Sequence, residues 1–91
     1  MKYTEWDELR EELFTPEEIA LQDAKAEFLC KLIDARKKKG FSQKKLGEET
    51  SIKQPVIARL EKGRTNPQLE TLIKILLPLG FKLSIEPIEA K

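Results

Sequence analysis

Residues 41–63 read FSQKKLGEETSIKQPVIARLEKG, and this stretch predicts two short helices joined by a tight turn. Ser42 can cap a helix over residues 43–50, and Gly63 can end a second helix over residues 54–62. The apolar side chains are spaced so that both helices pack on one core: Leu46, Ile52, Ile57 and Leu60. The second helix therefore keeps its other face free.

The free face of the second helix is polar and basic. It carries Lys53, Gln54, Pro55, Ala58 and Arg59, with Lys62 and Arg64 just beyond its end. Side chains near the start of such a helix can reach base edges in the major groove, an amide pairing with adenine and a guanidinium with guanine. The pattern is that of a helix-turn-helix, and the alternative is an ordinary helical hairpin with a solvated face.

The composition of the 91-residue chain excludes much of enzyme chemistry. With no histidine and one cysteine, the chain cannot form the common zinc sites, a thiolate cluster, an internal disulfide or a histidine-dependent active site. We expect no cofactor, no metal and no enzymatic activity. Cys30 fits a reducing, cytoplasmic location and is expected to pack within the apolar stretch 28–33 rather than to sense redox state. Neither a membrane span nor a signal peptide is expected.

Charge is segregated along the chain, although the total is only +1. Residues 1–30 hold three basic and nine acidic groups, a net charge of −6. Residues 31–64 hold eleven basic and four acidic groups, a net charge of +7, and residues 65–91 hold three of each. This distribution is typical of a polyanion-binding domain with an acidic appendage. The alternative is that the two signs merely solvate different faces.

Two helices are expected before the motif. A capping box at residues 4–7 opens a short helix that ends near residue 14, with Tyr3, Trp6, Leu9 and Leu13 on its apolar face. Residues 15–18, TPEE, are a stronger start signal for a helix that runs to residue 38 or 39, where Gly40 stops it. The buried stripe of that helix is Phe28, Leu29, Leu32 and Ile33.

After the motif the spacing of the apolar residues first predicts a helix and then a strand. Asn66-Pro67 is expected to start a helix that ends at residue 77 or 79. This helix is apolar nearly all round, which predicts burial against its own domain and against something else. Phe81, Leu83 and Ile85 then alternate with polar residues, which is a strand pattern. A lone strand needs a partner, either the same strand of a second copy or the sheet edge of another protein.

The whole stretch from Phe41 to Gly63 resembles the helix-turn-helix of the xenobiotic-response-element, Cro-like repressor superfamily, and the likeness covers about residues 29–80. More narrowly, the chain resembles the HigA-type antitoxins, which pair with RelE-like (HigB-type) toxins that cleave messenger RNA. This second likeness rests on residues 52–63, Asn66-Pro67, residues 69–72 and Leu79-Gly80.

The resemblance implies a fold and a domain plan. The fold is a mainly all-α, five-helix lambda-repressor-like helix-turn-helix domain, with an N-terminal helical extension and one C-terminal β-strand that pairs across a dimer. Residues 1–91 would form a single domain. Within it we expect an acidic extension over residues 1–25, a DNA-binding core over residues 26–80, and a dimerisation strand with its tail over residues 81–91.

The resemblance also implies site residues. Bases would be read by Gln54 and Arg59 and flanked by Lys53 and Pro55, while the DNA backbone would be held by Gln43, through its side chain or its amide, and by Lys62, Arg64 and Thr65. Arg36 and Glu61 match a structural ion pair of related repressors. Two positions depart from the family pattern: Ser51 replaces the usual glycine of the turn, and Gly47 replaces alanine. Ser51 is therefore expected at positive φ, unless the turn has a different geometry.

The functional expectation is an antitoxin that represses its own operon. A homodimer would occupy a palindromic, double-stranded operator and would bind the toxin in a heterotetramer, without any membrane contact. The toxin would meet Trp6, Leu9, Glu12, Leu13 and Glu17, and the dimer interface would contain Leu76, Phe81, Leu83 and Ile85. Three alternatives stay open: a stand-alone regulator, a protein-interaction module, and an N-terminal segment that only packs on its own core.

Overall fold

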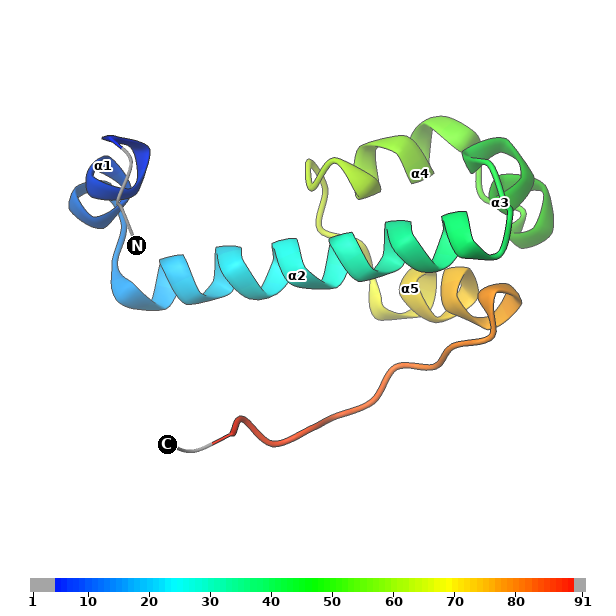
Figure 1. The fold of residues 1–91 in the computed structure, drawn as a ribbon. Helices are drawn as coiled ribbons and strands as arrows, with labels where there is room; N and C mark the ends of the chain where they lie inside the picture. Colours follow the sequence, from blue (N-terminus) through cyan, green and yellow to red (C-terminus); the bar gives the residue numbers. More distant parts are fainter. Residues whose placement is uncertain (1–4, 90–91) are drawn as a thin grey trace.

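The computed structural model describes residues 5–89, and every regular element in that range is a helix. In chain order the elements are α1 (Glu5–Leu13), α2 (Pro16–Lys38), α3 (Gln43–Thr50), α4 (Gln54–Glu61), α5 (Leu69–Leu76) and the 3₁₀ turn η1 (Leu77–Leu79) (Figure 1). The expected helical fold is confirmed, and the helical extension accounts for α1 and the first part of α2. None of the helices in this range is long and apolar enough to cross a bilayer.

The long helix α2 is the spine of the molecule. Its start is fixed by a capping box, in which Glu18 N–H donates to Thr15 Oγ1 (3.1 Å) and Thr15 N–H donates to Glu18 Oε1 (2.8 Å). Pro16 takes the first helical position, where its missing N–H costs nothing. At the other end Gly40, at φ 83°, takes the left-handed conformation that ends the helix. The predicted start and stop of this helix are confirmed.

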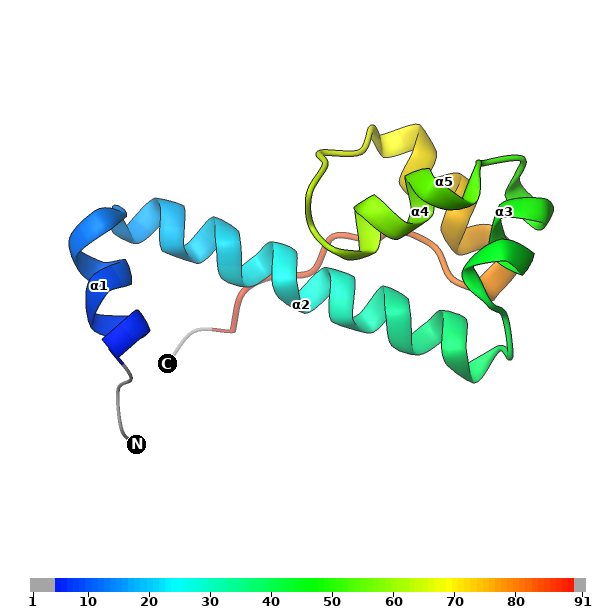
Figure 2. The same ribbon diagram turned by 90° about the horizontal axis from the view of Figure 1, so that it is seen from above.

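The molecule is elongated because α2 extends beyond the body. The C-terminal half of α2 packs against α3, α4 and α5, whereas its N-terminal half projects away and carries α1 at the far end (Figures 1 and 2). The radius of gyration is 15.5 Å, against about 12 Å for a compact domain of this length. The acidic α1 and the helix-turn-helix thus lie at opposite ends of one rod.

The core lies between the C-terminal half of α2 and the three short helices. Its buried side chains are Leu29, Leu32, Leu46, Ile57, Leu60, Ile75, Leu76 and Leu79. Of the predicted α2 stripe, Leu29 and Leu32 are buried, and Phe28 and Ile33 are half-buried. Cys30 is exposed, so the expectation that it packs in the core is wrong. A rotation of about 100° per residue turns it off the line defined by Leu29 and Leu32.

One cation, Arg10, ties α1 to α2 through three hydrogen bonds. The Arg10 guanidinium donates to Gln22 Oε1 (3.0 Å), to the Ile19 carbonyl (3.4 Å) and to Asp23 Oδ1 (2.7 Å). The apolar residues of the same helix stay exposed: Trp6, Leu9 and Leu13 are 55%, 45% and 60% exposed. None of the three belongs to the buried core of the described chain, and the choice between a toxin contact and packing on α2 stays open. The predicted cap at Thr4 and the apolar contact of Tyr3 fall outside the described residues.

Helix α5 begins later than expected. Asn66-Pro67 does not open it, because the helix starts at Leu69 and Gln68 takes the N-cap position without a side-chain cap bond. The Asn66 amide oxygen instead accepts a hydrogen bond from Lys25 Nζ on α2 (3.2 Å), so it is not used as a helix cap. The predicted end is close, since the last α-helical turn tightens into η1 before Gly80.

Residues 81–89 run alongside α2 as an extended segment (Figures 1 and 2). Its backbone bond to the rest of the described chain is Phe81 N–H to the Leu76 carbonyl (3.0 Å). A β-ladder needs a second strand, and none is present within residues 5–89 of a single chain. The pairing strand stays a prediction.

The turn between α3 and α4 explains both departures from the family pattern. Ser51 has φ 60° and ψ 25°, so it occupies the left-handed region that glycine usually takes. Gly47 lies where α3 meets the turn, and a Cβ there would come within 2.6 Å of the Ile52 carbonyl oxygen. Glycine at 47 therefore allows a closer crossing than alanine would, and the positive φ predicted for Ser51 is confirmed.

The Ser51→Gly variant is expected to raise the free energy of unfolding by about 0.5–1 kcal/mol. Glycine relieves roughly 1–2 kcal/mol of strain in the left-handed conformation. Part of this gain is offset because glycine increases the conformational entropy of the unfolded chain. Urea unfolding followed by circular dichroism measures the difference. Ser84→Gly is the matched control, because Ser84 is exposed and has no positive φ, and it should change nothing. Equal or lower stability of Ser51→Gly would contradict the strained turn.

Candidate nucleic-acid interface

Helix α4 is anchored on one side and open on the other. Ile57 and Leu60 are each 1% exposed and fasten it to the core. The predicted reading residues lie on its outer side, where Lys53, Gln54, Pro55 and Arg59 are all exposed. Figure 1 shows this helix on the face of the body away from α5 and the tail, so no other element covers it. The geometry leaves the N-terminal turn of α4 free to enter a groove.

Basic groups surround α4 without local partners. Lys62 and Arg64 are exposed just after the helix, and Thr65 beside them is half-buried. Within residues 5–89, no carboxylate makes an ion pair with Lys53, Arg59, Lys62 or Arg64. Unpaired cations of this kind are available for phosphate oxygens, and they would release counterions on binding.

The Arg36–Glu61 pair is buried beneath this surface. Arg36 Nε lies 2.6 Å from Glu61 Oε2, and Arg36 Nη2 donates to Glu61 Oε1 (3.0 Å). A third group, Arg36 Nη1, donates to the Phe41 carbonyl (2.9 Å). The side chains of Arg36 and Glu61 are 9% and 5% exposed, so neither can reach a phosphate. The pair ties α2 to the end of α4.

Gln43 is placed differently from the other predicted DNA contacts. Its Nε2 donates to Glu61 Oε1 (2.9 Å), so its side chain belongs to the buried network and does not point to a ligand. The phosphate contact expected from Gln43 is then left to its backbone N–H. The Ser42 hydroxyl accepts from Lys45 N–H (3.0 Å), while the first two N–H groups of α3 have no acceptor within the helix.

Lys25 is the residue that the sequence did not reveal. It projects from α2, and its Nζ donates to the Gly63 carbonyl and to Asn66 Oδ1, both at 3.2 Å. Leu29, one turn later, lies under the same corner, 3.4 Å from where a Gly63 Cβ would be. The loop that carries Arg64 and Thr65 is thus held from α2 by one ammonium. A lysine followed four residues later by leucine is too common a pattern to have marked this role.

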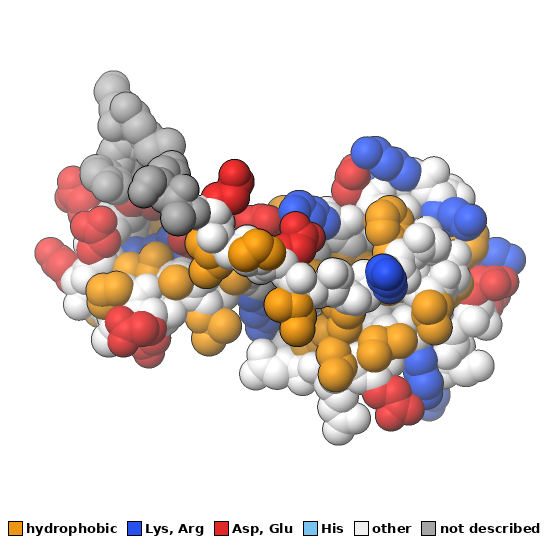
Figure 3. Space-filling view, turned by 90° about the horizontal axis from the view of Figure 1, so that it is seen from below, with side chains coloured by type: hydrophobic (Ala, Val, Ile, Leu, Met, Phe, Trp, Pro, Cys, Tyr) orange, Lys and Arg blue, Asp and Glu red, His pale blue; other side chains and the backbone are white. Residues whose placement is uncertain are grey.

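The residues predicted to meet a toxin gather at the far end of α2. Trp6, Leu9, Glu12 and Leu13 on α1 are exposed, as is Glu17 in the first turn of α2. Figure 3 shows acidic side chains clustered at this end and Lys and Arg side chains over the body. A missed member of the set is Leu21, which is 69% exposed on the adjoining part of α2.

The predicted dimer residues differ in exposure. Leu76 is 6% exposed and belongs to the core, and the groove beside the tail is lined in part by it. The exposed apolar side chains of α5 and of the first residue of η1 are Leu69, Ile73 and Leu77, spaced four residues apart. That a second partner covers this side stays a prediction. Phe81 and Ile85 are 53% and 98% exposed, and Leu83 is half-buried against the core.

Comparison with known proteins places these features in a family. The family model described as "Helix-turn-helix" matches residues 32–85, which include α3, α4 and α5. The chain belongs to the helix-turn-helix family.

Two relatives of this helix-turn-helix chain are informative. A protein of Haemophilus influenzae, described as an uncharacterized HTH-type transcriptional regulator, is 48% identical over 86 residues, which are 94% of this chain and 88% of that protein. A solved structure described as a toxin-antitoxin module from Streptococcus pneumoniae is 46% identical, with a TM-score of 0.69 and 97% of both chains covered. Both likenesses extend well beyond the helix-turn-helix motif into α1 and the first half of α2.

Lys25→Met is expected to loosen the loop after α4 while leaving the core intact. Methionine keeps the aliphatic stem but loses both hydrogen bonds of the ammonium, which should cost about 1–2 kcal/mol. Hydrogen exchange of the amides of residues 63–66 should become faster by about tenfold. Lys31→Met is the matched control, since exposed Lys31 pairs with Glu27 on the same helix and with no other carboxylate of residues 5–89. Unchanged exchange in Lys25→Met would show that the ammonium does not hold the loop.

Proposed function

We propose that this helix-turn-helix protein is a homodimeric repressor of its own operon and an antitoxin for a RelE-like (HigB-type) toxin. The observation that carries the proposal is that one elongated chain presents two different exposed surfaces at its opposite ends. A basic, unpaired α4 face lies at one end, and an acidic helix with an exposed apolar stripe lies at the other. The likeness to the Streptococcus pneumoniae toxin-antitoxin module supports the assignment of the second surface.

At the DNA end, α4 enters the major groove with its N-terminal turn first. Gln54 and Arg59 read base edges, Lys53 and Pro55 flank them, and Lys62, Arg64 and Thr65 hold the sugar-phosphate backbone together with the Gln43 amide. A two-fold dimer places two copies of α4 about 34 Å apart, on successive major grooves of a palindrome. Occupancy of that site excludes RNA polymerase.

At the toxin end, the chemistry of the partner follows from its substrate. A ribonuclease binds a polyanion and therefore presents a basic surface, which an acidic helix can cover. Helix α1 alone contributes five carboxylates, from Glu5, Asp7, Glu8, Glu11 and Glu12, against the single cation Arg10. Trp6, Leu9 and Leu13 supply the apolar area that a stable interface needs at its centre. A heterotetramer of two toxins on one repressor dimer follows if each rod binds one toxin.

The second candidate function is a stand-alone transcriptional regulator without a toxin. The Haemophilus influenzae relative, described only as a regulator, favours this alternative. The neighbouring reading frame separates the two, because the antitoxin proposal requires a basic protein of about 100 residues encoded beside this gene.

Arg59→Ala is expected to lower affinity for the chain's own promoter by about 10- to 100-fold and to change affinity for random DNA much less. One good base contact contributes about 1–3 kcal/mol of discrimination. Electrophoretic mobility shifts over a salt series measure both affinities. Lys62→Ala serves as the contrasting variant. Because Lys62 is expected to contact a phosphate, its loss should weaken binding to both DNAs alike and reduce the slope of log affinity against log salt concentration by about one. If Arg59→Ala weakens binding to both DNAs equally, Arg59 contacts a phosphate and does not read a base.

The double variant Leu9→Ala/Leu13→Ala is expected to abolish co-purification with the neighbouring basic protein and to leave promoter binding unchanged. Each exposed leucine buried at an interface contributes about 1.5–3 kcal/mol, so the loss should exceed about a hundredfold in affinity. Leu69→Ala, at a position that is 65% exposed but lies on α5, is the control. Retained co-purification would refute the assignment of α1, and deletion of residues 1–15 should reproduce the loss.

A further inference from the structure

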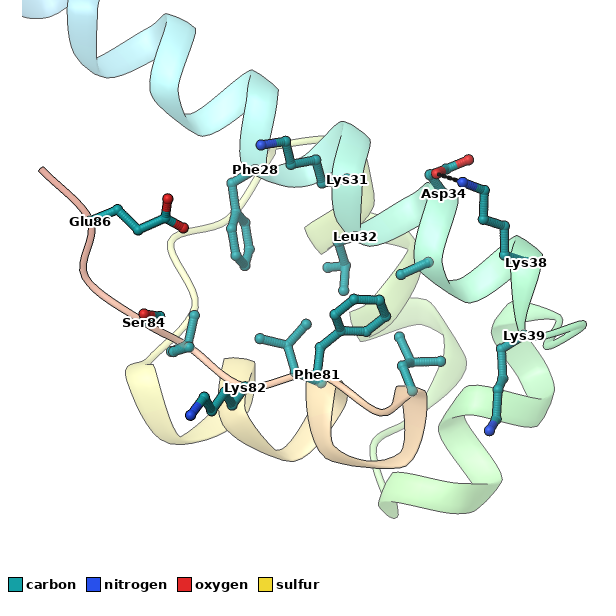
Figure 4. A pocket seen from close by; sticks show the side chains of 14 residues that line it. Phe28, Lys31, Leu32, Asp34, Lys38, Lys39, Phe81, Lys82, Ser84 and Glu86 are labelled. Carbon is teal, nitrogen blue, oxygen red and sulfur yellow. Dashed lines mark ion pairs between the residues drawn. The ribbon is translucent and has the colours of Figure 1, made fainter. Parts of the chain in front are cut away.

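A hollow lies on each half of α2. The larger, about 760 Å³, lies between the C-terminal half of α2 and the extended tail, and Figure 4 shows Phe28 and Phe81 pointing into it from opposite sides. It belongs to the surface that the proposed dimer uses. The smaller, about 520 Å³, lies at the elbow between α1 and α2, and we call it the elbow pocket. Its lining residues are Glu11, Phe14, Pro16, Ile19, Ala20 and Asp23.

The floor of the elbow pocket is apolar. It is made by Phe14 and Ile19, which are half-buried, and by the exposed residues Pro16 and Ala20. Helix α1 has no buried residue, so it leaves this floor open to water. An apolar floor of this kind favours an occupant that brings hydrocarbon with it.

The rim of the elbow pocket is acidic. Glu11 is exposed and forms no ion pair within residues 5–89. Asp23 Oδ1 accepts from Arg10 (2.7 Å), but the Asp23 side chain is 64% exposed, which leaves room for a second donor. Residues 5–24 hold eight carboxylates and a single cation, Arg10, which is already bound to α2. The rim therefore has carboxylate oxygens available for a positive charge from outside.

An occupant of the elbow pocket has to suit the floor and the rim together. A purely apolar side chain would remove water from the two carboxylates without replacing its hydrogen bonds, which is costly. No group of three or more potential metal ligands exists among residues 5–89, so the rim is not a metal site. Arginine and lysine combine a long aliphatic stem with a charged head. The stem can lie on the floor while the head donates to the rim.

We propose that the elbow pocket receives an arginine or lysine side chain of the partner protein that binds α1. This inference rests on the proposed function and adds an anchor point to it. A ribonuclease toxin presents a basic surface, and one cation of that surface has the chemistry that the pocket accepts. A few anchor side chains that fill pockets carry most of the binding energy of an interface, and arginine is frequent among them.

The elbow pocket is a separate contact from the exposed apolar stripe of α1. Glu11 lies two residues after Leu9 and two before Leu13, which places it about 200° around the helix from both. A partner that fills the pocket and covers the stripe therefore holds α1 from two sides. Because Glu11 lies on α1 and Asp23 on α2, the rim is complete only while α1 lies against α2, and the Arg10 hydrogen bonds maintain that arrangement.

One matched pair of variants of the full-length chain tests the floor of the elbow pocket. Ala20→Phe fills the floor, whereas Ala24→Phe makes the same change one turn later, at an exposed position that does not line the pocket. The partner is the basic protein encoded by the neighbouring reading frame, freed from the co-purified complex by denaturation and refolded. Titration calorimetry should show affinity lowered by about tenfold or more for Ala20→Phe and by about twofold or less for Ala24→Phe.

A second matched pair tests the charge of the rim. Glu11→Gln removes a rim carboxylate, and Glu8→Gln removes an equal charge from an exposed position of the same helix outside the pocket. Glu11→Gln should lower affinity by about tenfold, because a charge-assisted hydrogen bond is lost, and Glu8→Gln by about twofold or less. The loss caused by Glu11→Gln should shrink at high salt, whereas the steric loss caused by Ala20→Phe should persist. Circular dichroism checks that all four variants fold as the wild type does.

Equal effects within either pair would overturn the proposal. In the alanine pair, equality would mean that the floor is not occupied. In the glutamate pair, equality would mean that the general acidity of the segment is enough, and weakening by Ala20→Phe without any by Glu11→Gln would indicate an apolar occupant. Altered self-association of Ala20→Phe, measured by sedimentation of the chain alone, would also overturn it, because a second copy would then be the occupant.

Failure of this inference is distinguishable from failure of the proposed function. If the wild type does not bind the neighbouring protein, the antitoxin function and the pocket assignment fall together. If the wild type binds it, and Leu9→Ala/Leu13→Ala abolishes binding while Ala20→Phe and Glu11→Gln do not weaken it, the pocket assignment alone is wrong.

Discussion

The buried ion pair between Arg36 and Glu61 is the constraint on which the orientation of α4 depends. Glu61 accepts three hydrogen bonds, two from Arg36 and one from Gln43, and Arg36 also donates to the Phe41 carbonyl. One network therefore joins α2, the start of α3 and the end of α4. Burying two charges is costly, and loss of either partner from such a pair costs about 3–5 kcal/mol because the other charge is left uncompensated. In the described chain no buried side-chain polar atom lacks a partner.

This pair fixes where the candidate reading face points. Arg59 lies two residues before Glu61, about 200° around the helix, so fixing Glu61 toward α2 turns Arg59 toward solvent. The turn before α4 acts on the other end of the same helix. Ser51 in the left-handed region and Gly47 beneath the Ile52 carbonyl set how closely α3 and α4 approach. A chain that differs from its family at both positions can therefore still present α4 outward.

Local patterns predicted the elements, and the failures have two physical causes. The capping box at Thr15 and the stop at Gly40 depend on a few adjacent residues, so the sequence is enough to place them. The αL turn at Ser51 was expected from the resemblance, because related chains usually have glycine there. Cys30 was misplaced because burial depends on the rotation of a helix about its axis. An apolar run does not report that rotation. The start of α5 shifted because Asn66 bonds with Lys25, which is 41 residues away in the sequence. The candidate DNA face was predictable from spacing, but the Lys25 support was not.

Helix α2 spans 23 residues, or about 35 Å. It therefore holds the acidic N-terminal segment far from the basic helix-turn-helix. In the proposed function a toxin on α1 and an operator on α4 do not compete for surface, and a coupling carried within one chain passes along α2. The contact that links the projecting half of α2 to the DNA side is Lys25 on Gly63 and Asn66. Two hydrogen bonds from one ammonium limit such a coupling to about 1–3 kcal/mol, or roughly 5- to 150-fold in affinity. A toxin acting by this route would adjust operator occupancy rather than abolish it.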